Sequence, residues 1–385
     1  MHYFRYRHGS ILSFKELLYN EIYFGSSEEC NDPYDSMAFY EFPADSLRWR
    51  RLLEQSFDIA DQKLKSRLLD VLVAHICSKP TISFADLMSK AFLNELPLSE
   101  VVNSQTLEDV ERNVRGFVRQ YIPQKQHFAC FSTSGENLLM WSHYANHHRG
   151  FCLIFQAIDN KLKQHGVLSA KQVRRKTRNG LAPDMSYTLP TEFEFQQISY
   201  AGAVEPLNAF RCMNQHVYSE ELSDDERWQL REEQNSHFLQ KEQSWQYEHE
   251  YRIVLKSPPQ WLFGEEILYS PHERLFHYQP TQLVGIIMGA KMSEADKKSV
   301  SEIINQKRRE MYREKPPFIL FDFVTFEAKM ANNDRSIQLV PVEILGGAAS
   351  LFPSDEQFKE RLASWQNGQG LEFSDAGSAR KIAVK

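Results

Sequence analysis

The sequence predicts an α+β fold in which short strands form a core, helices flank it, and one large helical segment is inserted. Three observations lead to this prediction. Short apolar or alternating runs bounded by turn residues recur between residues 3 and 342, as strands do. Segments with apolar residues three and four apart lie between them, as in amphipathic helices. Residues 44–123 show the helical spacing alone.

The first 43 residues are expected to form a strand, a helix and a second strand. Aromatic and basic side chains alternate over residues 3–7, which suits a short strand. Ser10 then begins a helical pattern, and residues 21–25 have the composition of a second strand. The Asn-Asp-Pro sequence at 31–33 follows in a cluster of turn formers and predicts a loop.

Residues 44–123 are expected to be an all-helical insertion between two parts of one core. The core would comprise residues 1–43 and 124–345, and residues 346–385 would form a polar tail. The insertion is either a recognition subdomain that binds a partner protein or a helical buttress of the core. Its apolar residues on repeating helical faces include Leu52, Leu53, Ile59, Leu68, Leu69, Leu72, Val73 and Ile76.

The rest of the core alternates between strands and helices. A strand beginning at His127 should be followed by a helix that starts near Gly135. Residues 161–189 are polar and basic, and form either an exposed loop or a contact for an anionic partner. Its basic residues are Lys171, Arg174, Arg175, Lys176 and Arg178. Further strands are expected at 151–155, 197–204, 250–255, 283–288, 318–326 and 337–342, and helices at 222–243, 293–314 and, more weakly, 356–365.

Composition limits the classes of function and partner. The formal charge of −6 and the pI near 6.1 argue against a general field that attracts nucleic acid. The five cysteines lack CxxC spacing, which favours reduced thiols in a cytoplasmic protein. The charged first residues do not resemble a signal peptide, and no run of eighteen apolar residues occurs, so neither export nor a membrane partner is expected.

Residues 127–150 carry the most informative motif. An apolar run stops at Ser132, Thr133 and Ser134, and a helical segment rich in His, Tyr and Trp follows. Two companions, residues 4–9 and 245–255, are aromatic strand-like segments with charges that a half-buried strand does not need. Together the three segments predict a site for a small polar ligand, assembled from distant parts of the chain.

Motifs along the chain resemble those of two known families. Tyr6-Arg7, IYFGSSEECNDPYD, CFS followed by LMWSHYANHHRGFC, WQYEHEYR and the late IIMG resemble, in order and spacing, the bacterial domain of unknown function 2971 (DUF2971). That resemblance extends from residue 3 to about 304, apart from the insertion. A second resemblance is to the ADP-ribosyltransferase superfamily, and it implies a split β-sheet core. It rests on a basic residue of the first strand, Ser-Thr-Ser at 132–134 and Glu-His-Glu at 248–250.

The second resemblance implies NAD as the substrate. Glu250 would stabilise the oxocarbenium-like state of the ribose, and Glu248 would share its face and perturb its pKa. Ser132 would orient the glutamate or the ribose. Arg7, or else Arg5, would hold the pyrophosphate through its planar fork of donors.

Other residues would complete the NAD site. Trp141 or Tyr144 would stack on the nicotinamide ring, and the loop at 31–32 would line the pocket. The expected NAD-binding residues are Arg5, Tyr6, Arg7, Asn31, Asp32, Ser134, Trp141, His143 and Tyr144. No metal is expected, because His147 and His148 would point about 100 degrees apart on a helix.

Structural interpretations of the same residues stay open. Arg7 is equally suited to pair with an acid on an edge strand. Glu250 and Arg252 share a strand face and could form an ion-pair network, with Ile253 facing the core. Trp141 and Tyr144 could anchor the core, His143 could be a hydrogen-bonded structural residue, and Asn31 and Asp32 could serve turn chemistry.

The predicted function is NAD-dependent transfer of ADP-ribose to a macromolecular acceptor, protein or nucleic acid. By analogy, such a bacterial enzyme would serve a toxin or phage-defence system. Two alternatives are a noncatalytic nucleotide sensor that uses Arg7, Asn31 and Tyr144, and a metal-dependent nuclease that uses Asp32, Asp35 and Glu250. The nuclease would require a lysine-bearing strand motif that the sequence lacks.

Overall fold

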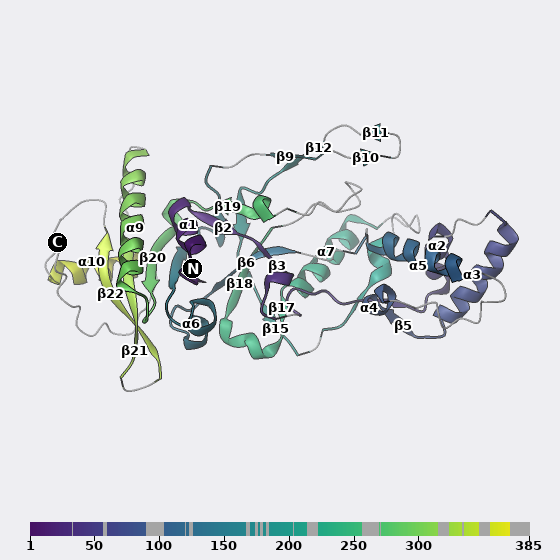
Figure 1. Ribbon diagram of the computed structural model, residues 1–385, viewed down its shortest axis with the longest axis horizontal. Helices are drawn as coiled ribbons and strands as arrows, with labels where there is room; N and C mark the ends of the chain where they lie inside the picture. Colours follow the sequence, from purple (N-terminus) through teal and green to yellow (C-terminus); the bar gives the residue numbers. More distant parts are fainter. Residues whose placement is uncertain are drawn as a thin grey trace.

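A mostly antiparallel sheet forms the centre of the fold, with a helical lobe at one end of the molecule and the C-terminal helices at the other (Figure 1). The computed structural model describes residues 1–32, 34–56, 60–89, 104–119, 121–122, 126–166, 170–173, 176–177, 180–181, 185–202, 204–213, 222–255, 269, 271–314, 323–332, 335–345 and 355–369. It confirms a mixed α+β fold.

The main sheet contains nine strands within these described ranges. Its order is β14-β18-β6-β1-β7-β20-β21-β22, and β3 pairs with β6 beside this path. Neighbours are antiparallel, apart from the parallel pair β20 and β21. The bounds are β1 (His2–Arg7), β3 (Gly25–Ser26), β6 (His127–Ser132), β7 (Phe151–Gln156), β14 (Gln196–Gln197), β18 (Glu250–Leu255), β20 (Leu283–Met288), β21 (Phe323–Met330) and β22 (Ile337–Leu345).

The sheet is joined weakly between β1 and β6. β1 pairs with β7 over six residues, and β18 pairs with β6 over six, but β1 meets β6 only at Phe4 and Ser132. Arg5 lies in the wedge that this leaves, and its guanidinium donates to the carbonyl oxygens of Cys130 (3.5 Å) and Tyr23 (3.4 Å). The sheet therefore consists of two halves that share one pair of residues.

Different helices cover the two faces of the sheet. α1 (Ile11–Tyr19) and α9 (Glu294–Glu314) pack on one face, where Leu17, Val300 and Ile304 join a core with the sheet. α6 (Leu138–Tyr144) and α10 (Asp355–Gln369) pack on the other face through residues such as Trp141 and Trp365. Local sequence sets the helix starts: Ser10 caps α1 as expected, and the Asn137 side chain caps α6.

Lys307 of α9 fastens α9 to the end of α1. Its buried ammonium donates to the carbonyl oxygen of Leu17 at 2.7 Å and also to the Asn20 side chain, and it lies over the Tyr278 ring. Burial lowers the pKa of Lys307 to about 8. Because the unfolded chain binds this proton up to about pH 10 and the folded chain releases it near pH 8, this group adds stability as the pH rises through that window.

We therefore compare the free energy of unfolding of the wild type with that of Lys307→Met. Between pH 7 and pH 10, the difference should shift in favour of the wild type by about 1–3 kcal/mol. Urea unfolding at both pH values measures the difference. Lys298→Met, which alters a lysine with a 78% exposed side chain on the same helix, should show no such change. An equal difference at both pH values for Lys307→Met would contradict the lowered pKa.

The lobe has a core of its own. Trp49, Leu72 and Val114 pack there with Phe42 and Phe210, which come from outside residues 44–123. Its helices are α2 (Ser46–Ser56), α3 (Gln62–Ile76), α4 (Phe84–Met88) and α5 (Ser104–Arg119). A small sheet of β16 (Leu207–Asn208), β4 (Tyr40–Pro43) and β5 (Thr81–Ser83) and the 3-10 helix η2 (Ala209–Met213) complete it. The expectation of an all-helical segment is wrong at β5, and the lobe core extends beyond the expected boundaries.

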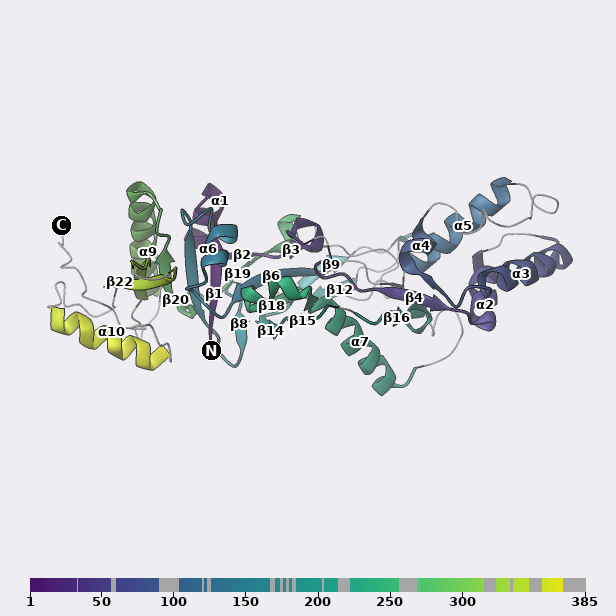
Figure 2. The same ribbon diagram turned by 90° about the horizontal axis from the view of Figure 1, so that it is seen from below.

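Described residues between 161 and 241 also form short strand pairs beside the main sheet, and Figure 2 shows α7 extending away from it. The pairs are β8 (Lys161–Lys163) with β13 (Glu192–Glu194), β9 (Ala170–Val173) with β12 (Met185–Thr188), β10 (Lys176–Thr177) with β11 (Gly180–Leu181), and β15 (Ser199–Tyr200) with β17 (Gln240–Lys241). α7 spans Asp224–Phe238, and the 3-10 helix η4 spans Gln243–Glu248. Arg174, Arg175 and Arg178 lie outside the described residues, so the basic segment remains a prediction.

Most predicted core elements are confirmed, with local differences. The expected strand at 21–25 is two strands, because β2 (Glu21–Tyr23) pairs with β19 (Leu275–His277) while β3 pairs with β6. The strand expected at 197–204 is reduced to β14 and β15, and the one at 318–326 is described only from Phe323. Short 3-10 helices occur as η1 (Ser27–Glu29), η5 (Pro271–Arg274) and η6 (Pro280–Gln282). Within the described ranges, every helix is too short or too polar to span a lipid bilayer.

Candidate functional site

A buried cluster of charged side chains lies on one face of β6 and β18. Along β18, Ile253 and Leu255 point to the core beneath α1, and Glu250 and Arg252 alternate to the opposite face. There Glu250 is paired with Ser132 of β6. On this part of the sheet, buried polar and charged residues replace the apolar residues that a sheet normally buries.

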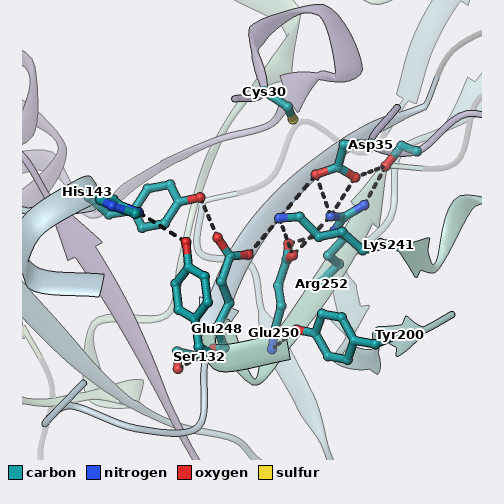
Figure 3. A network of polar contacts seen from close by, with 12 residues as sticks. Cys30, Asp35, Ser132, His143, Tyr200, Lys241, Glu248, Glu250 and Arg252 are labelled. Carbon is teal, nitrogen blue, oxygen red and sulfur yellow. Dashed lines mark hydrogen bonds and ion pairs between the residues drawn. The ribbon is translucent and has the colours of Figure 1, made fainter. Parts of the chain in front are cut away.

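Arg252 is the centre of the cluster and has no exposed surface (Figure 3). Its guanidinium donates to both carboxylate oxygens of Glu250, at 2.7 and 3.0 Å, and reaches Asp35 at 2.7 Å. It also donates to the Ser36 hydroxyl and lies 4.2 Å from the centroid of the Phe128 ring. Arg252 thus ties the loop that carries Asp35 to the sheet through charge-assisted hydrogen bonds.

Lys241 of β17 is a second buried cation, and it joins three carboxylates. Its ammonium donates to Glu248 at 2.6 Å and to Glu250 at 3.1 Å, and it lies 3.3 Å from Asp35. The Trp245 ring lies 4.9 Å away on another side. Three acids and two bases therefore share one buried volume, which leaves one negative charge in excess within this set.

Glu248, itself buried, connects this cluster to half-buried and exposed side chains nearer the surface. One carboxylate oxygen binds Lys241, and the other accepts a hydrogen bond from the Tyr144 hydroxyl at 2.5 Å. Tyr144 is half-buried, and the exposed Asn31 side chain lies close enough to its hydroxyl to lower the pKa of Tyr144, against the larger effect of burial. Beside it, the exposed His143 shares a hydrogen bond of 3.0 Å with the half-buried Tyr247 (Figure 3).

The backbone around Glu248 is held in place by hydroxyl groups. Ser132 donates to the carbonyl oxygen of Glu248 at 2.7 Å and accepts from the backbone N–H of Ser134. The Tyr200 hydroxyl accepts from the backbone N–H of Glu250 at 2.8 Å. Between them, His249 adopts a left-handed conformation with a φ of 44°, which ends η4 and lets both carboxylates meet at Lys241.

The two glutamates have opposite pKa shifts. Burial alone would raise the pKa of Glu250, but Arg252 and Lys241 outweigh it and lower that pKa to about 2. Burial raises the pKa of Glu248, and the negative charge of Glu250 adds to this, while Lys241 opposes it. Burial and Glu248 together raise the pKa of Tyr144. Glu250 is therefore an anion at neutral pH, and Glu248 is the carboxyl group of this pair that binds a proton more readily.

A family model described as "Protein of unknown function (DUF2971)" matches residues 140–253. No curated protein and no solved structure matches the chain significantly. The DUF2971 match supports the resemblance expected from the sequence over this part of the chain. It includes Tyr144, Lys241, Glu248, Glu250 and Arg252, and so covers most of the charged cluster.

Six of the expected site residues meet around this DUF2971 segment. Glu248 and Glu250 contact the ammonium of Lys241, and the Ser132 hydroxyl donates to the backbone carbonyl oxygen of Glu248. Tyr144, Asn31 and His143 lie on the solvent side of Glu248. Two of the three expected segments, around residues 132–144 and 248–250, therefore converge here together with Asn31, whereas the charged side chains of residues 4–9 do not.

Arg5 and Arg7 do not join this group, which corrects the expected trio of guanidinium, hydroxyl and acid. Alternation along β1 places Arg5 and Arg7 on the same face as Tyr3. Tyr3 packs in the core beneath α1, on the face of the sheet opposite to Glu250. Arg7 forms an ion pair with Glu16 of α1. Arg5 packs over Phe131, and burial lowers its pKa to about 10. The alternative interpretation of Arg7, pairing with an acid, is the one that the structure supports.

Other expected NAD-binding residues have structural contacts. Trp141 has no exposed surface and donates to the carbonyl oxygen of Gly135, so it cannot stack on a ligand. Tyr6 packs edge-on against Trp141 and donates to the carbonyl oxygen of Ser134. The Ser134 hydroxyl accepts from the Glu136 N–H. Buried Asp32 accepts from the N–H of Tyr34 at 2.9 Å, as its turn interpretation requires.

Sequence reasoning missed Lys241 and assigned Asp35 only to the nuclease alternative. A single lysine after a long charged helix has no pattern that separates it from a solvated residue. Asp35 and Glu250 are occupied by Arg252 and Lys241, which disfavours them as metal ligands. Within the described part of the chain, no group of three His, Cys, Asp or Glu side chains could hold a metal ion.

Proposed function

We propose that the site binds NAD and transfers its ADP-ribose group to a macromolecular acceptor, with Glu248 facing the ribose. The observation that carries this proposal is the position of Glu248, between a buried charged cluster and a rim of half-buried and exposed side chains. One side of its carboxylate is fixed by Lys241 and the other by Tyr144. A carboxylate held in this way can stabilise a developing positive charge without reorganising.

In this reaction the bond between nicotinamide nitrogen and ribose C1′ breaks. Its electron pair stays with the nitrogen, so nicotinamide leaves as a neutral molecule and the ribose acquires oxocarbenium character. Ionised Glu248 stabilises that charge. The acceptor then forms a bond to C1′ and gives its proton to the carboxylate of Glu248, whose raised pKa makes it the stronger base of the two glutamates.

The roles of the neighbouring residues differ from those expected of the superfamily. Glu250 supports Glu248 through Lys241 instead of touching the ribose. Tyr144 and Tyr247 offer aromatic surface for the nicotinamide ring, with Asn31 and His143 as polar neighbours. No arginine of β1 takes part. We extend the proposal to an ADP-ribosyltransferase-like split sheet, which the single residue pair between β1 and β6 supports. A role in bacterial toxin or phage-defence systems rests on analogy.

The test is release of nicotinamide from NAD labelled in that ring. We expect Glu248→Gln to reduce the rate about 100-fold or more, because the amide keeps the shape but loses the charge. Glu294→Gln makes the same change at an exposed position of α9 and should leave the rate unchanged. Circular dichroism establishes that both variants are folded.

Other outcomes separate the alternatives. Tight binding of NAD without release of nicotinamide would favour a noncatalytic sensor, which the complete internal pairing of Glu250 also suits. Cleavage of DNA or RNA that depends on a divalent metal would favour a nuclease. Equal rates for the wild type and Glu248→Gln would remove Glu248 from the reaction.

A further inference from the structure

Lys241 bridges three carboxylates, one from the loop before β4, one from η4 and one from β18. An ammonium group has three hydrogens, and three carboxylates lie within 3.3 Å of this one, from Asp35, Glu248 and Glu250. The residue is buried, and its own pKa is raised: burial opposes its charge, but Glu250, Asp35 and Glu248 outweigh that effect. Lys307, buried without such partners at its ammonium, has a lowered pKa instead.

The contacts of Glu248 make Lys241 its cationic partner. Among the described residues, Arg252 bonds to Glu250 and Asp35, whereas the contacts of the Glu248 carboxylate are Lys241 and Tyr144. The titratable and charged groups that face Glu248 from the surrounding elements are Lys241 of β17, Tyr144 of α6, Glu250 and Arg252 of β18, Asp35 of the loop before β4, and Tyr200 and Tyr247. Loss of Lys241 would leave Glu248 among two acids and three phenols, with Arg252 already bound to Glu250 and Asp35.

We propose that Lys241 is a positioning residue that keeps Glu248 ionised and aimed at the substrate, and thereby sets the lower pH limit of the reaction. This inference rests on the proposed function for its catalytic consequence. Its electrostatic part concerns the ionisation of Glu248 and holds whether or not the protein turns over NAD.

Removal of the lysine has a defined consequence for pH. A nearby cation favours the charged form of an acid, so Lys241→Met should raise the pKa of Glu248 by at least one pH unit. At a pH below the pKa of Glu248 in both proteins, nicotinamide release should then fall about tenfold for each unit of that shift, and it should recover as the pH rises, because Glu248 must be ionised to act. Lys241→Arg keeps the positive charge and should leave the pH profile close to that of the wild type.

The experiment combines two readouts on the full chain. The first is the pH profile of nicotinamide release. The second is the pH titration of the Glu248 carboxyl carbon, followed by carbon-13 NMR of glutamate-labelled protein and assigned with Glu248→Gln. Lys297→Met is the matched control, because it removes a lysine that bridges Glu294 and Glu327 elsewhere. That control should move neither readout.

The outcomes test the control of Glu248 by Lys241 separately from the proposed function. A titration of Glu248 that does not move in Lys241→Met overturns the inference, whatever the rates are. A titration that moves in a protein that never releases nicotinamide overturns the proposed function and supports control of Glu248 by Lys241. If Lys241→Met does not fold, Lys241→Arg still decides: a wild-type profile supports the inference, and a profile displaced by a full unit contradicts it.

Discussion

Replacing Arg252 with Met is expected to lower the free energy of unfolding by about 3–5 kcal/mol at pH 7. Arg252 has no exposed surface and bonds to two buried carboxylates, Glu250 and Asp35. Methionine fills much of the same space but leaves two anions in a volume of low polarity, with Lys241 alone to compensate them. Urea unfolding followed by circular dichroism measures this change.

The control for this variant is Arg112→Met, which removes an ion pair with Asp109 from a side chain that is 68% exposed. Its effect should stay below about 1 kcal/mol. Arg252→Lys keeps the charge and loses the planar fork, so its effect should lie between the two. A loss below 1 kcal/mol for Arg252→Met would show that the buried cluster does not depend on the guanidinium.

The same variant has a pH signature. The folded-state pKa of Glu250, about 2, lies below its unfolded value, so its ionisation stabilises the fold at neutral pH. That contribution is lost as the pH falls from the usual carboxyl range, about 4.5, through about 2. The difference in stability between the wild type and Arg252→Met should therefore shrink over this range. A difference that grows instead would mean that the shift of Glu250 has another cause.

Replacing Trp49 with Ala is expected to lower the free energy of unfolding of the lobe by about 3–5 kcal/mol. Trp49 is fully buried, its ring packs against Phe42 and Phe210 with centroids 5.4 Å apart, and its indole donates to the carbonyl oxygen of Pro43. These neighbours come from strand β4 and helix η2, on either side of the predicted insertion. The substitution therefore opens a cavity where three separate segments meet.

Trp228→Ala is the matched control, since that side chain on α7 is 66% exposed. Its effect should be within about 0.5 kcal/mol. The measurement is urea unfolding followed by circular dichroism, because both variants remove a fluorophore. If Trp49→Ala were as mild as Trp228→Ala, residues 40–43 and 207–213 would not form one core with the helices.

The sequence predicted strands well where local composition alone determines them. β7 and β20 are continuous apolar runs, and a chain of that composition is most stable as a buried strand. β2 and β3 were merged, because a change of pairing partner after Tyr23 depends on β19, more than 250 residues away, and leaves no local signal. The same limit applies to the lobe. Its core includes Phe210, which lies far beyond the predicted insertion in sequence.

The face on which candidate residues lie was predicted correctly for β18 and not for β1, for the same physical reason. Alternation assigns residues to faces, and Ile253 marks which face of β18 is the core, so Glu250 was assigned correctly to the opposite side. In β1 both faces carry aromatic residues, Tyr3 on one and Tyr6 on the other. Nothing in that strand indicates the face of Arg7, and its expected partnership with Glu250 is wrong.

We propose that the substrate binds beside Glu248, on the face of the sheet that carries Glu250. A crystal structure of Glu248→Gln with NAD tests it most directly, since this variant should bind the substrate and turn it over slowly. We predict the ribose within hydrogen-bonding distance of residue 248 and the nicotinamide ring against Tyr144 or Tyr247. NAD bound instead beside Arg5 and Arg7, beneath α1, would contradict the account.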